Sequence, residues 1–542
     1  MKKRKLIFRV LPLALCMAMV FCLAACGQTG NSSGGSASKS EKATKASILH
    51  YGIQATPPNV DPTNLYDINA YSMVRQCYEG LTDRDESGKV KPGLATSWDT
   101  PDNGLTWHFV LSKGVKFHSG KELTAKDVKF TFERALSPKS KGDGATYLSD
   151  IKGADAIQKG SSTELSGFEI LGDYEFNIHF SKADMLFPAA CSIECLYIVD
   201  QSVVEGKDNN WWEKTSAGTG PFILTKYSED NKLVMKAFDK YRKGKPAISG
   251  IEFDIVGNDN TLMEMYQNGD LDIIAAPSSK LKTIRSDTKM SKQLKECISG
   301  DINYLGMNAD LYKPFADPRV REAVALVINQ KDIAEKIMNS TAKPLYGVIP
   351  VDFTGYNSEM ENQPAYNVEK AKKLLKEAGY DASNPLPKVT LVYLGVDEDN
   401  AAYIANQLKE KLGWPVKLES PDRSTLLDNL FDKKYSFFIW GCTADYGDEY
   451  TIADNFSTGA MRNFGNYSNK QYDALLDQAS KTANADARIK LYRQAEKILV
   501  LQDFGCVPLY TDVNFLLVKP SVSGVRYGCL GLDCLGDVSI TK

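Results

Sequence analysis

The sequence predicts an α/β fold in which a partly parallel sheet is covered by helices and the chain forms more than one lobe. Three observations lead to this prediction. Strand-like alternation and helix-like periodicity follow one another along the chain, and a β-α-β order recurs in its second half. The 542 residues, 43% hydrophobic and 25% charged, are enough for several cores. This composition excludes a disordered chain, a collagen and a multi-pass membrane protein.

The N-terminus has the pattern of an export signal. Residues 1–9 contain five basic residues and no acidic one, and an apolar run from Val10 to Ala25 follows. This run is shorter than the roughly 20 residues that a membrane-spanning helix needs, and it contains Pro12. It therefore predicts a secretion signal over residues 1–25.

Removal of this signal changes the charge of the protein. The full chain has a formal net charge of −3, whereas the part after residue 25 keeps 60 of the 65 basic residues against 68 acidic ones, a net charge of −8. Neither value is typical of a nucleic-acid-binding protein. The Gly/Ser-rich and charged stretch of residues 26–45 cannot bury a core and predicts a flexible tether.

Two elements of the first half follow from local pattern. Residues 106–111 alternate polar and apolar side chains, which predicts a strand with one buried face. Thr124 and Asp127 have the spacing of a capping box, which predicts a helix beginning there. The apolar face of this helix is formed by Val128, Phe132 and Leu136.

The second half shows helix boundaries and the β-α-β order. Asp317 and Pro318 are placed as an N-cap and the first helical residue, and Asn367 and Gly379 as the N-cap and the end of another helix. The patterns of a strand, a helix and a second strand then occupy residues 389–393, 400–412 and 416–418. This order predicts the partly parallel sheet.

Motifs of catalysis are nearly absent. The sequence contains no nucleotide-binding P-loop and no G-x-S-x-G elbow. Ser279 to Lys282 matches S-x-x-K, but the companion motifs of penicillin-recognising enzymes are missing. The four histidines, His50, His108, His118 and His179, have no metal-ligand spacing and are expected on strand faces or the surface. We therefore expect no catalytic residue, no cofactor and no resident metal.

The number and spacing of the cysteines do not decide between disulfides and free thiols. Of the 11 cysteines, eight remain once the signal and Cys26 are set aside. Two pairs, Cys191/Cys195 and Cys529/Cys534, are close in sequence and are able to form disulfides in an oxidising compartment, and buried free thiols are the alternative.

A series of ordered segments resembles the solute-binding proteins of oligopeptide and dipeptide importers, a family that also includes nickel and pheromone binders. The strongest is residues 107–136, which is similar to the family's strand, GVKF-H-x-G turn and TA-x-DV-x-F helix. The other matching segments, spread from about residue 50 to 525, are Val60–Pro62, Tyr78–Leu81, Gly93–Trp98, Gly218–Phe222, Pro314–Arg321, Val507–Tyr510 and Leu517–Pro520.

The resemblance implies a fold of the type II periplasmic-binding-protein kind. Two lobes joined by a hinge close around the ligand, and one lobe carries an extra domain. The first lobe is expected to comprise 46–80, 214–298 and 508–542, with the extra domain at 81–213. The second lobe is expected at 299–507.

The end of the export signal resembles a bacterial lipobox. Leu23-Ala24-Ala25 stands immediately before Cys26, which implies cleavage before Cys26 and attachment of acyl chains, such as palmitate, to that cysteine. Burial of acyl chains would hold the exported protein at the extracytoplasmic face of the cell membrane. An ordinary cleaved signal that happens to contain a cysteine is the alternative.

The expected ligand pocket centres on residues 440–448. This segment follows the apolar strand 437–439, and ligands bind at the carboxyl ends of strands in open α/β sheets. In the peptide binders the aspartate of a similar G-x-x-A-D-Y segment accepts the α-ammonium group of the peptide, and Asp445 occupies that position. A turn aspartate that caps its own backbone is the alternative. Asp448 and Glu449 are expected to be solvated.

Five other residues are candidates for ligand contact. Tyr147 matches a tyrosine that packs over the peptide, and Tyr66 or Asp67 falls in the loop on the opposite side. Trp440 and Cys442 belong to the pocket segment, but Ile439 and Cys442 stand where the family has an aromatic residue and an arginine. Arg423, just before the predicted helix 424–430, is a candidate to meet a ligand carboxylate, and an ordinary surface arginine is the alternative.

These features favour a monomeric, lipid-anchored receptor that binds short peptides and delivers them to the permease and ATPase subunits of an ABC importer. A nickel or metal-chelate receptor of the same fold is the first alternative. A peptide sensor that hands its signal to another receptor is the second. An exported hydrolase with Ser279 as nucleophile is a third, from a different class.

Overall fold

The computed structural model describes residues 47–65, 68–207, 210–228 and 232–541. The predicted export signal, Cys26 and the tether therefore lie outside the described residues, as do Tyr66 and Asp67. Among the described residues, none of the helices combines the length and the apolar character that a membrane span requires.

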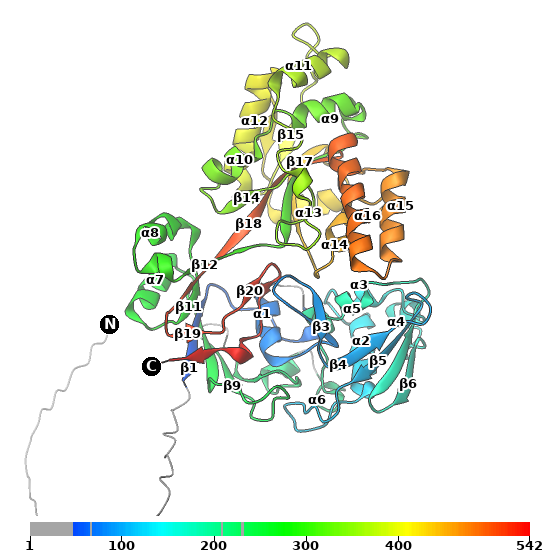
Figure 1. Ribbon diagram of the computed structural model, residues 1–542, viewed down its shortest axis with the longest axis vertical. Helices are drawn as coiled ribbons and strands as arrows, with labels where there is room; N and C mark the ends of the chain where they lie inside the picture. Colours follow the sequence, from blue (N-terminus) through cyan, green and yellow to red (C-terminus); the bar gives the residue numbers. More distant parts are fainter. Residues whose placement is uncertain (1–46, 66–67, 208–209, 229–231, 542) are drawn as a thin grey trace, which may run out of the picture. The chain divides into compact units, whose positions relative to one another are not determined.

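One large mixed sheet extends through most of the chain (Figure 1). Its strands lie in the order β16-β15-β17-β13-β18-β11-β1-β10-β9-β8, and β12 and β14 also pair with β18. β1 pairs in parallel with β10 and β11, and β15 with β16 and β17, so the predicted partly parallel sheet is confirmed. In sheet order the bounds are Lys417–Glu419, Thr390–Val392, Phe437–Thr443, Asp301–Met307, Cys506–Val518, Ile273–Ala275, Ile48–Ile53, Gly250–Ile255, Lys232–Ala237 and Phe222–Lys226, with Leu294–Ile298 for β12 and Ala342–Pro344 for β14.

The sheet has helices on both faces in the second half of the chain. Successive side chains of β17 point to opposite faces, so Phe437 and Ile439 join one buried cluster and Phe438 another. The first cluster is covered by α9 (Pro318–Ala325), α11 (Val368–Glu377) and α12 (Glu398–Leu412). The second is covered by α13 (Arg423–Phe431), α15 (Lys470–Ser480) and α16 (Ala485–Lys497).

The predicted helix starts of this half are confirmed. The Asp317 carboxylate accepts a hydrogen bond from the Arg319 amide, and the Asn367 side chain accepts one from the Lys370 amide. Helix α12 lies between β15 and β16 in sequence, so the strand-helix-strand order predicted for residues 389–418 is confirmed as well.

A separate four-stranded sheet forms in the first half. Its order is β4-β5-β7-β6, and the predicted strand 106–111 is β5, whose Trp107, Phe109 and Leu111 are buried. The predicted helix is α2 (Ala125–Leu136), and both hydrogen bonds of its capping box are present between Thr124 and Asp127. The other strands of this sheet are β4 Ala95–Asp99, β6 Phe168–Gly172 and β7 Glu175–His179.

The remaining elements are short or peripheral. Three two-stranded ribbons are β2 Thr82–Arg84 with β3 Val90–Pro92, β19 Val522–Ser523 with β22 Ser539–Ile540, and β20 Tyr527–Gly528 with β21 Gly531–Leu532. The other helices are α1 Ile68–Cys77, α3 Gly144–Leu148, α4 Ala154–Gln158, α5 Phe187–Ala190, α6 Gln201–Val204, α7 Asp259–Asn268, α8 Leu281–Ser286, α10 Gln330–Asp332 and α14 Tyr450–Ala453.

All eight described cysteines are free thiols. The two sequence-adjacent pairs Cys191/Cys195 and Cys529/Cys534 are therefore not disulfides in this structure. Cys191, Cys195 and Cys529 are buried, which corresponds to the alternative of buried free thiols.

Candidate functional site

Asp445 lies two residues beyond the carboxyl end of β17. The Ala444 amide donates a 2.8 Å hydrogen bond to the carbonyl oxygen of Gly300, so the chain stays next to β13 as it leaves the sheet. The Asp445 amide donates to the hydroxyl of Thr451 at 2.9 Å, and this hydroxyl lies 3.3 Å from the Asp445 carboxylate. The carboxylate is 32% exposed and thus remains accessible to a ligand.

The Asp445 carboxyl is held in an unusual electrostatic environment. Burial raises its pKa, since the charged form loses hydration, while the Arg462 guanidinium lowers it. One guanidinium nitrogen of Arg462 lies 3.9 Å from the carboxylate, and 46% of the arginine side chain is exposed. Arg462 was not identified from the sequence, because an exposed arginine 17 residues after Asp445 carries no local pattern.

Tyr147 approaches the same carboxylate from α3. Its hydroxyl forms a hydrogen bond that lowers the pKa of Asp445, and burial followed by the charge of Asp445 raises the pKa of Tyr147. Its ring meets Tyr446 edge to face, with centroids 6.4 Å apart and an interplanar angle of 75°. The fold therefore brings together two residues that were predicted separately, one from each half of the chain.

Trp440 and Cys442 lie within β17 rather than after it, because the strand continues to Thr443. Their side chains share one face of the strand and are both partly exposed. The Trp440 ring packs edge-on against Phe464 at 6.0 Å between centroids. Burial raises the pKa of the Cys442 thiol to about 12, so this cysteine is a neutral group near the site and not a reactive thiolate.

Arg423, the remaining candidate among the described residues, is not brought to Asp445. Arg423 is the first residue of α13 and is exposed. In the part of the chain that the structure describes, no hydrogen bond or ion pair joins it to Asp445 or Tyr147.

The prediction that Asp448 and Glu449 are solvated is wrong. Asp448 is 6% exposed and Glu449 4%. Asp448 accepts hydrogen bonds from Arg488 at 3.0 and 3.1 Å and from the Tyr492 hydroxyl at 2.7 Å, while Glu449 accepts one from the Gly355 amide at 2.6 Å. Partners from α16 and from the loop before α11 satisfy both carboxylates, and burial raises the pKa of Glu449 to about 7.

The loop after Asp445 meets a hairpin from the first half of the chain. The Gly88 position, where the backbone has φ +83°, is so close that a Cβ there would lie 2.6 Å from the Gly447 Cα atom. Gly88 belongs to the turn between β2 and β3. Glycine is required at both position 88 and position 447, because a side chain at either would push the two backbones apart.

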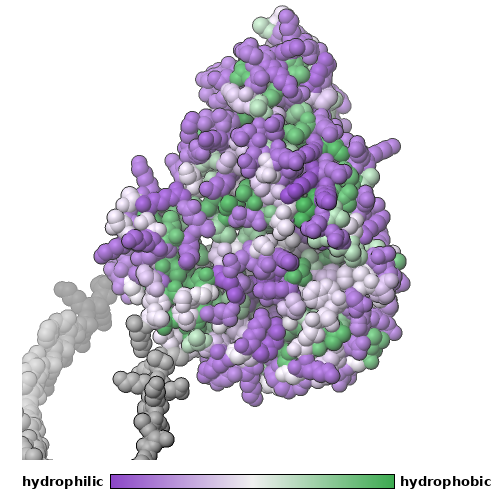
Figure 2. All heavy atoms as spheres, in the orientation of Figure 1, coloured by the Kyte–Doolittle hydropathy of each residue, from purple (hydrophilic) through white to green (hydrophobic). Residues whose placement is uncertain are grey.

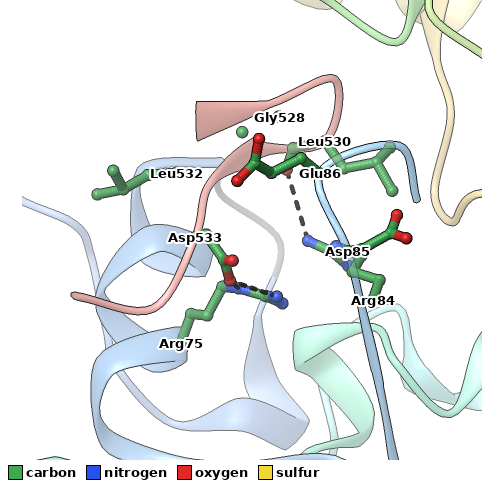
Figure 3. A pocket seen from close by; sticks show the side chains of 9 residues that line it. Arg75, Arg84, Asp85, Glu86, Gly528, Leu530, Leu532 and Asp533 are labelled. Carbon is green, nitrogen blue, oxygen red and sulfur yellow. Dashed lines mark hydrogen bonds and ion pairs between the residues drawn. The ribbon is translucent and has the colours of Figure 1, made fainter. Parts of the chain in front are cut away.

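Figure 3 shows the base of this hairpin, where two buried arginines hold separate segments together. Arg75 donates to one oxygen of Asp533 at 2.8 and 3.0 Å, and Arg84 donates to Glu194 at 2.6 Å and to the Leu530 carbonyl at 3.4 Å. The cavity beside them has a volume of about 10 Å³, the size of a single water. The two arginines anchor the hairpin, and the cavity is too small for a ligand.

Two other sequence features lie elsewhere. Ser279 is exposed and donates a 2.9 Å hydrogen bond to Asp259, whose other carboxylate oxygen accepts one from the Gln54 side chain at 2.7 Å. His50 lies on β1 next to Glu252 and Asp254 of β10, the one set of three possible metal ligands that converge within 4.8 Å in the described chain. Lys232 forms ion pairs with both of these carboxylates, at 2.7 and 3.1 Å.

A family model described as "Bacterial extracellular solute-binding proteins, family 5 Middle" matches residues 89–464. The chain belongs to this family. Members of family 5 are substrate-binding proteins rather than enzymes. The resemblance inferred from the sequence motifs is therefore confirmed, and the family is that of the binding components of ABC importers.

Similar proteins differ in the ligand after which they are named. The probable deoxycholate-binding periplasmic protein YgiS of Escherichia coli (strain K12) is 28% identical over 88% of this chain and 90% of its own length. The heme-binding protein A of Haemophilus influenzae is 28% identical over 96% and 98%. The dipeptide-binding protein DppE of Bacillus subtilis (strain 168) is 26% identical over 95% of each chain.

Solved structures of this family share the fold. The murein tripeptide-binding protein MppA in its unliganded open form superposes with a TM-score of 0.81 at 26% identity, covering 92% of this chain and 98% of that one. Haemophilus influenzae OppA in complex with the peptide RPPGFSPFR gives a TM-score of 0.72 at 26% identity, covering 92% and 100%. The two-lobed α/β fold class of this family 5 protein is therefore confirmed.

Proposed function

We propose that this family 5 protein is the extracytoplasmic, lipid-anchored receptor of an ABC importer and that it binds short peptides between its two lobes. Relatives named for oligopeptides and dipeptides support the ligand class, as does the fold shared with OppA in complex with a nonapeptide. The absence of a nucleotide-binding motif from the sequence agrees with a chain that leaves ATP hydrolysis to separate subunits.

The environment of Asp445 is the observation that carries this proposal. A peptide's α-ammonium group that leaves water needs an anionic partner, because an unpaired buried charge is strongly unfavourable. Asp445 offers a partly exposed carboxylate at a strand's carboxyl end, next to the aromatic rings of Tyr147 and Tyr446. Aromatic faces hold the main chain of a peptide without selecting its side chains.

We assign the lobes as the sequence predicts. The first comprises 46–80, 214–298 and 508–542 with the extra domain 81–213, and the second comprises 299–507. One buried cluster that includes Leu49, Phe109, Phe253 and Leu535 supports the first lobe with its extra domain. The two clusters on either face of β17 support the second. β18 contributes to clusters of both lobes, which supports it as part of the hinge.

Membrane attachment is assigned to Cys26. In this proposal acyl chains on Cys26 fix the protein to the membrane, and residues 26–45 are the tether that lets the receptor meet both peptides and the permease. Metabolic labelling with palmitate tests this assignment. Label should enter the full chain and be absent from Cys26→Ser, whereas equal labelling of both would refute it.

Calorimetric titration of the full chain with a library of short peptides tests the ligand class. We expect saturable binding, a ligand-dependent rise in melting temperature, and loss of about tenfold or more in affinity for Asp445→Asn. The matched control is Asp399→Asn, which removes an exposed carboxylate of α12. Binding of heme, deoxycholate or a nickel chelate with no response to any peptide would contradict the proposal.

A further inference from the structure

A second group of carboxylates lies beside Asp445 across two neighbouring strands. Asp301 begins β13, and its carboxylate accepts hydrogen bonds at 3.2 Å from the Asp512 amide and from the Thr511 hydroxyl of β18. The Asn303 amide group donates to Asp301 at 3.0 Å and to Asp512 at 3.5 Å. These contacts hold the two carboxyl groups against each other.

A third carboxylate extends the group. Asp397, at the turn before α12, accepts a 2.8 Å hydrogen bond from the Tyr510 hydroxyl of β18. Its charge raises the pKa of Asp512, although burial and the neighbouring Asp301 are the larger causes. In the described chain no lysine or arginine nitrogen lies within 4.0 Å of these three carboxylates. Asp445, in contrast, has Arg462.

The group adjoins the proposed ammonium site. Asp301 is the register partner of Thr443 in β17, two residues before Asp445, and the charges of Asp301 and Asp445 both act on the Cys442 thiol between them. β17, β13 and β18 are consecutive strands of the sheet. A short peptide whose ammonium group binds Asp445 is therefore long enough for one of its next side chains to approach Asp301 and Asp512.

Asn400, next to Asp397, is a second observation that points to a missing hydrogen-bond donor. Its side chain is 1% exposed, and its Nδ2 atom lies 3.3 Å from the Tyr510 hydroxyl and 3.4 Å from Asp397. Its Oδ1 atom has no hydrogen-bond partner among the described residues. A buried acceptor without a donor is unfavourable, and an N–H group brought by a ligand would satisfy it.

The arrangement favours an organic cation over a metal ion. A bare cation needs ligand oxygens that converge on one point, and the one converging set in the described chain is His50, Glu252 and Asp254. The oxygens around Asp512 are spread over two strands and a turn. Several N–H donors on one side chain, as in an ammonium or a guanidinium, match such a spread.

We propose that Asp301, Asp512 and Asp397, with Asn400, receive the cationic side chain of a lysine or arginine in the ligand, so that this receptor selects basic peptides. The inference rests on the proposed peptide-binding function and specifies its substrate class.

Calorimetric titration with matched peptides tests this proposal on the full chain. The probes are alanine tripeptides to pentapeptides in which one position carries lysine, arginine, norleucine or glutamate. We expect lysine or arginine at one position to bind about tenfold or more tightly than norleucine, as is typical of a charge-assisted hydrogen bond. Glutamate there should be the weakest.

The variants distinguish this group of carboxylates from the proposed ammonium site at Asp445. Asp512→Asn and Asp301→Asn should reduce the preference for lysine over norleucine to within about twofold while norleucine peptides still bind, and Asp399→Asn should keep the preference. Equal affinities for lysine and norleucine in the wild type, an unchanged preference in both variants, or calcium binding at this group would overturn the inference. Failure of every peptide would instead contradict the proposed function.

Discussion

The Arg462 guanidinium lies 3.9 Å from the Asp445 carboxylate and lowers the pKa of a group whose burial raises it. An ionised Asp445 is what an ammonium ligand requires, so the arginine extends the pH range over which the proposed site works. The arginine side chain is 46% exposed, so its charge acts on Asp445 from the solvent side.

Arg462→Gln should therefore shift the pH dependence of peptide binding. Without the guanidinium, the pKa of Asp445 rises further, so that binding is lost at a higher pH as the solution is acidified. Affinity measured from pH 4 to pH 8 gives the midpoint for each protein. Arg423→Gln is the matched control, since it removes an exposed arginine without contact to Asp445, and it should leave the midpoint unchanged. Coincident profiles of wild type and Arg462→Gln would refute this role.

Asp512 should make the stability of the protein depend on pH. Burial and Asp301 raise its pKa in the folded state to about 8, with Asp397 adding to the rise and Asn303 opposing it. The unfolded value is near 3.9. The folded state thus binds this proton more tightly, and the stabilisation is complete below about pH 4 and declines as the pH rises towards 8.

The comparison of wild type with Asp512→Asn isolates this contribution. Between pH 5 and 8 the free energy of unfolding of the wild type should fall more steeply, by up to about 1.4 kcal/mol per pH unit for one proton. Denaturant unfolding at several pH values measures the difference, with Asp399→Asn as the control that keeps the wild-type slope. Parallel curves for Asp512→Asn and wild type would show that Asp512 titrates normally.

Gly447→Ala should disturb the loop of Asp445 from outside the ligand site. A Cβ at this position overlaps with the Gly88 carbonyl, so the hairpin and the loop must separate. We expect a loss of about 1–3 kcal/mol in the free energy of unfolding and weaker peptide binding. Gly172→Ala is the control, because nothing lies within 4 Å of a Cβ there. Wild-type stability and affinity in Gly447→Ala would mean that this close approach is dispensable.

Local sequence patterns were sufficient to predict the parts of the fold and of the site that depend on residues close together in sequence. The Thr124 capping box, the Asn367 N-cap and the strand leading to Asp445 all follow from residues within a few positions of one another. The burial of Asp448 does not, because it depends on Arg488, 40 residues away. The contact of Asp301 with Asp512 spans 211 residues and exists only once β13 and β18 pair.

The Asp448 network predicts how rigidly Asp445 is held. Asp448 is three residues from Asp445, and Arg488 and Tyr492 of α16 bind both of its oxygens. Asp448→Asn leaves the Arg488 guanidinium, 14% exposed, without its counter-ion. Removing one partner of such a buried pair costs about 3–5 kcal/mol, so a large drop in melting temperature is expected. Peptide affinity measured well below that temperature should fall as well, since the turn that carries Asp445 loses its anchor.

A second variant distinguishes anchoring of the loop from general instability. Tyr492→Phe removes one neutral hydrogen bond to Asp448 and keeps the ion pair with Arg488, so a loss of about 1 kcal/mol is expected and peptide affinity should change little. If Asp448→Asn unfolds at a lower temperature yet binds peptide as tightly as wild type, the ion pair stabilises α16 against the loop without positioning Asp445. If both variants lose affinity in proportion to stability, the turn and α16 behave as one cooperative unit.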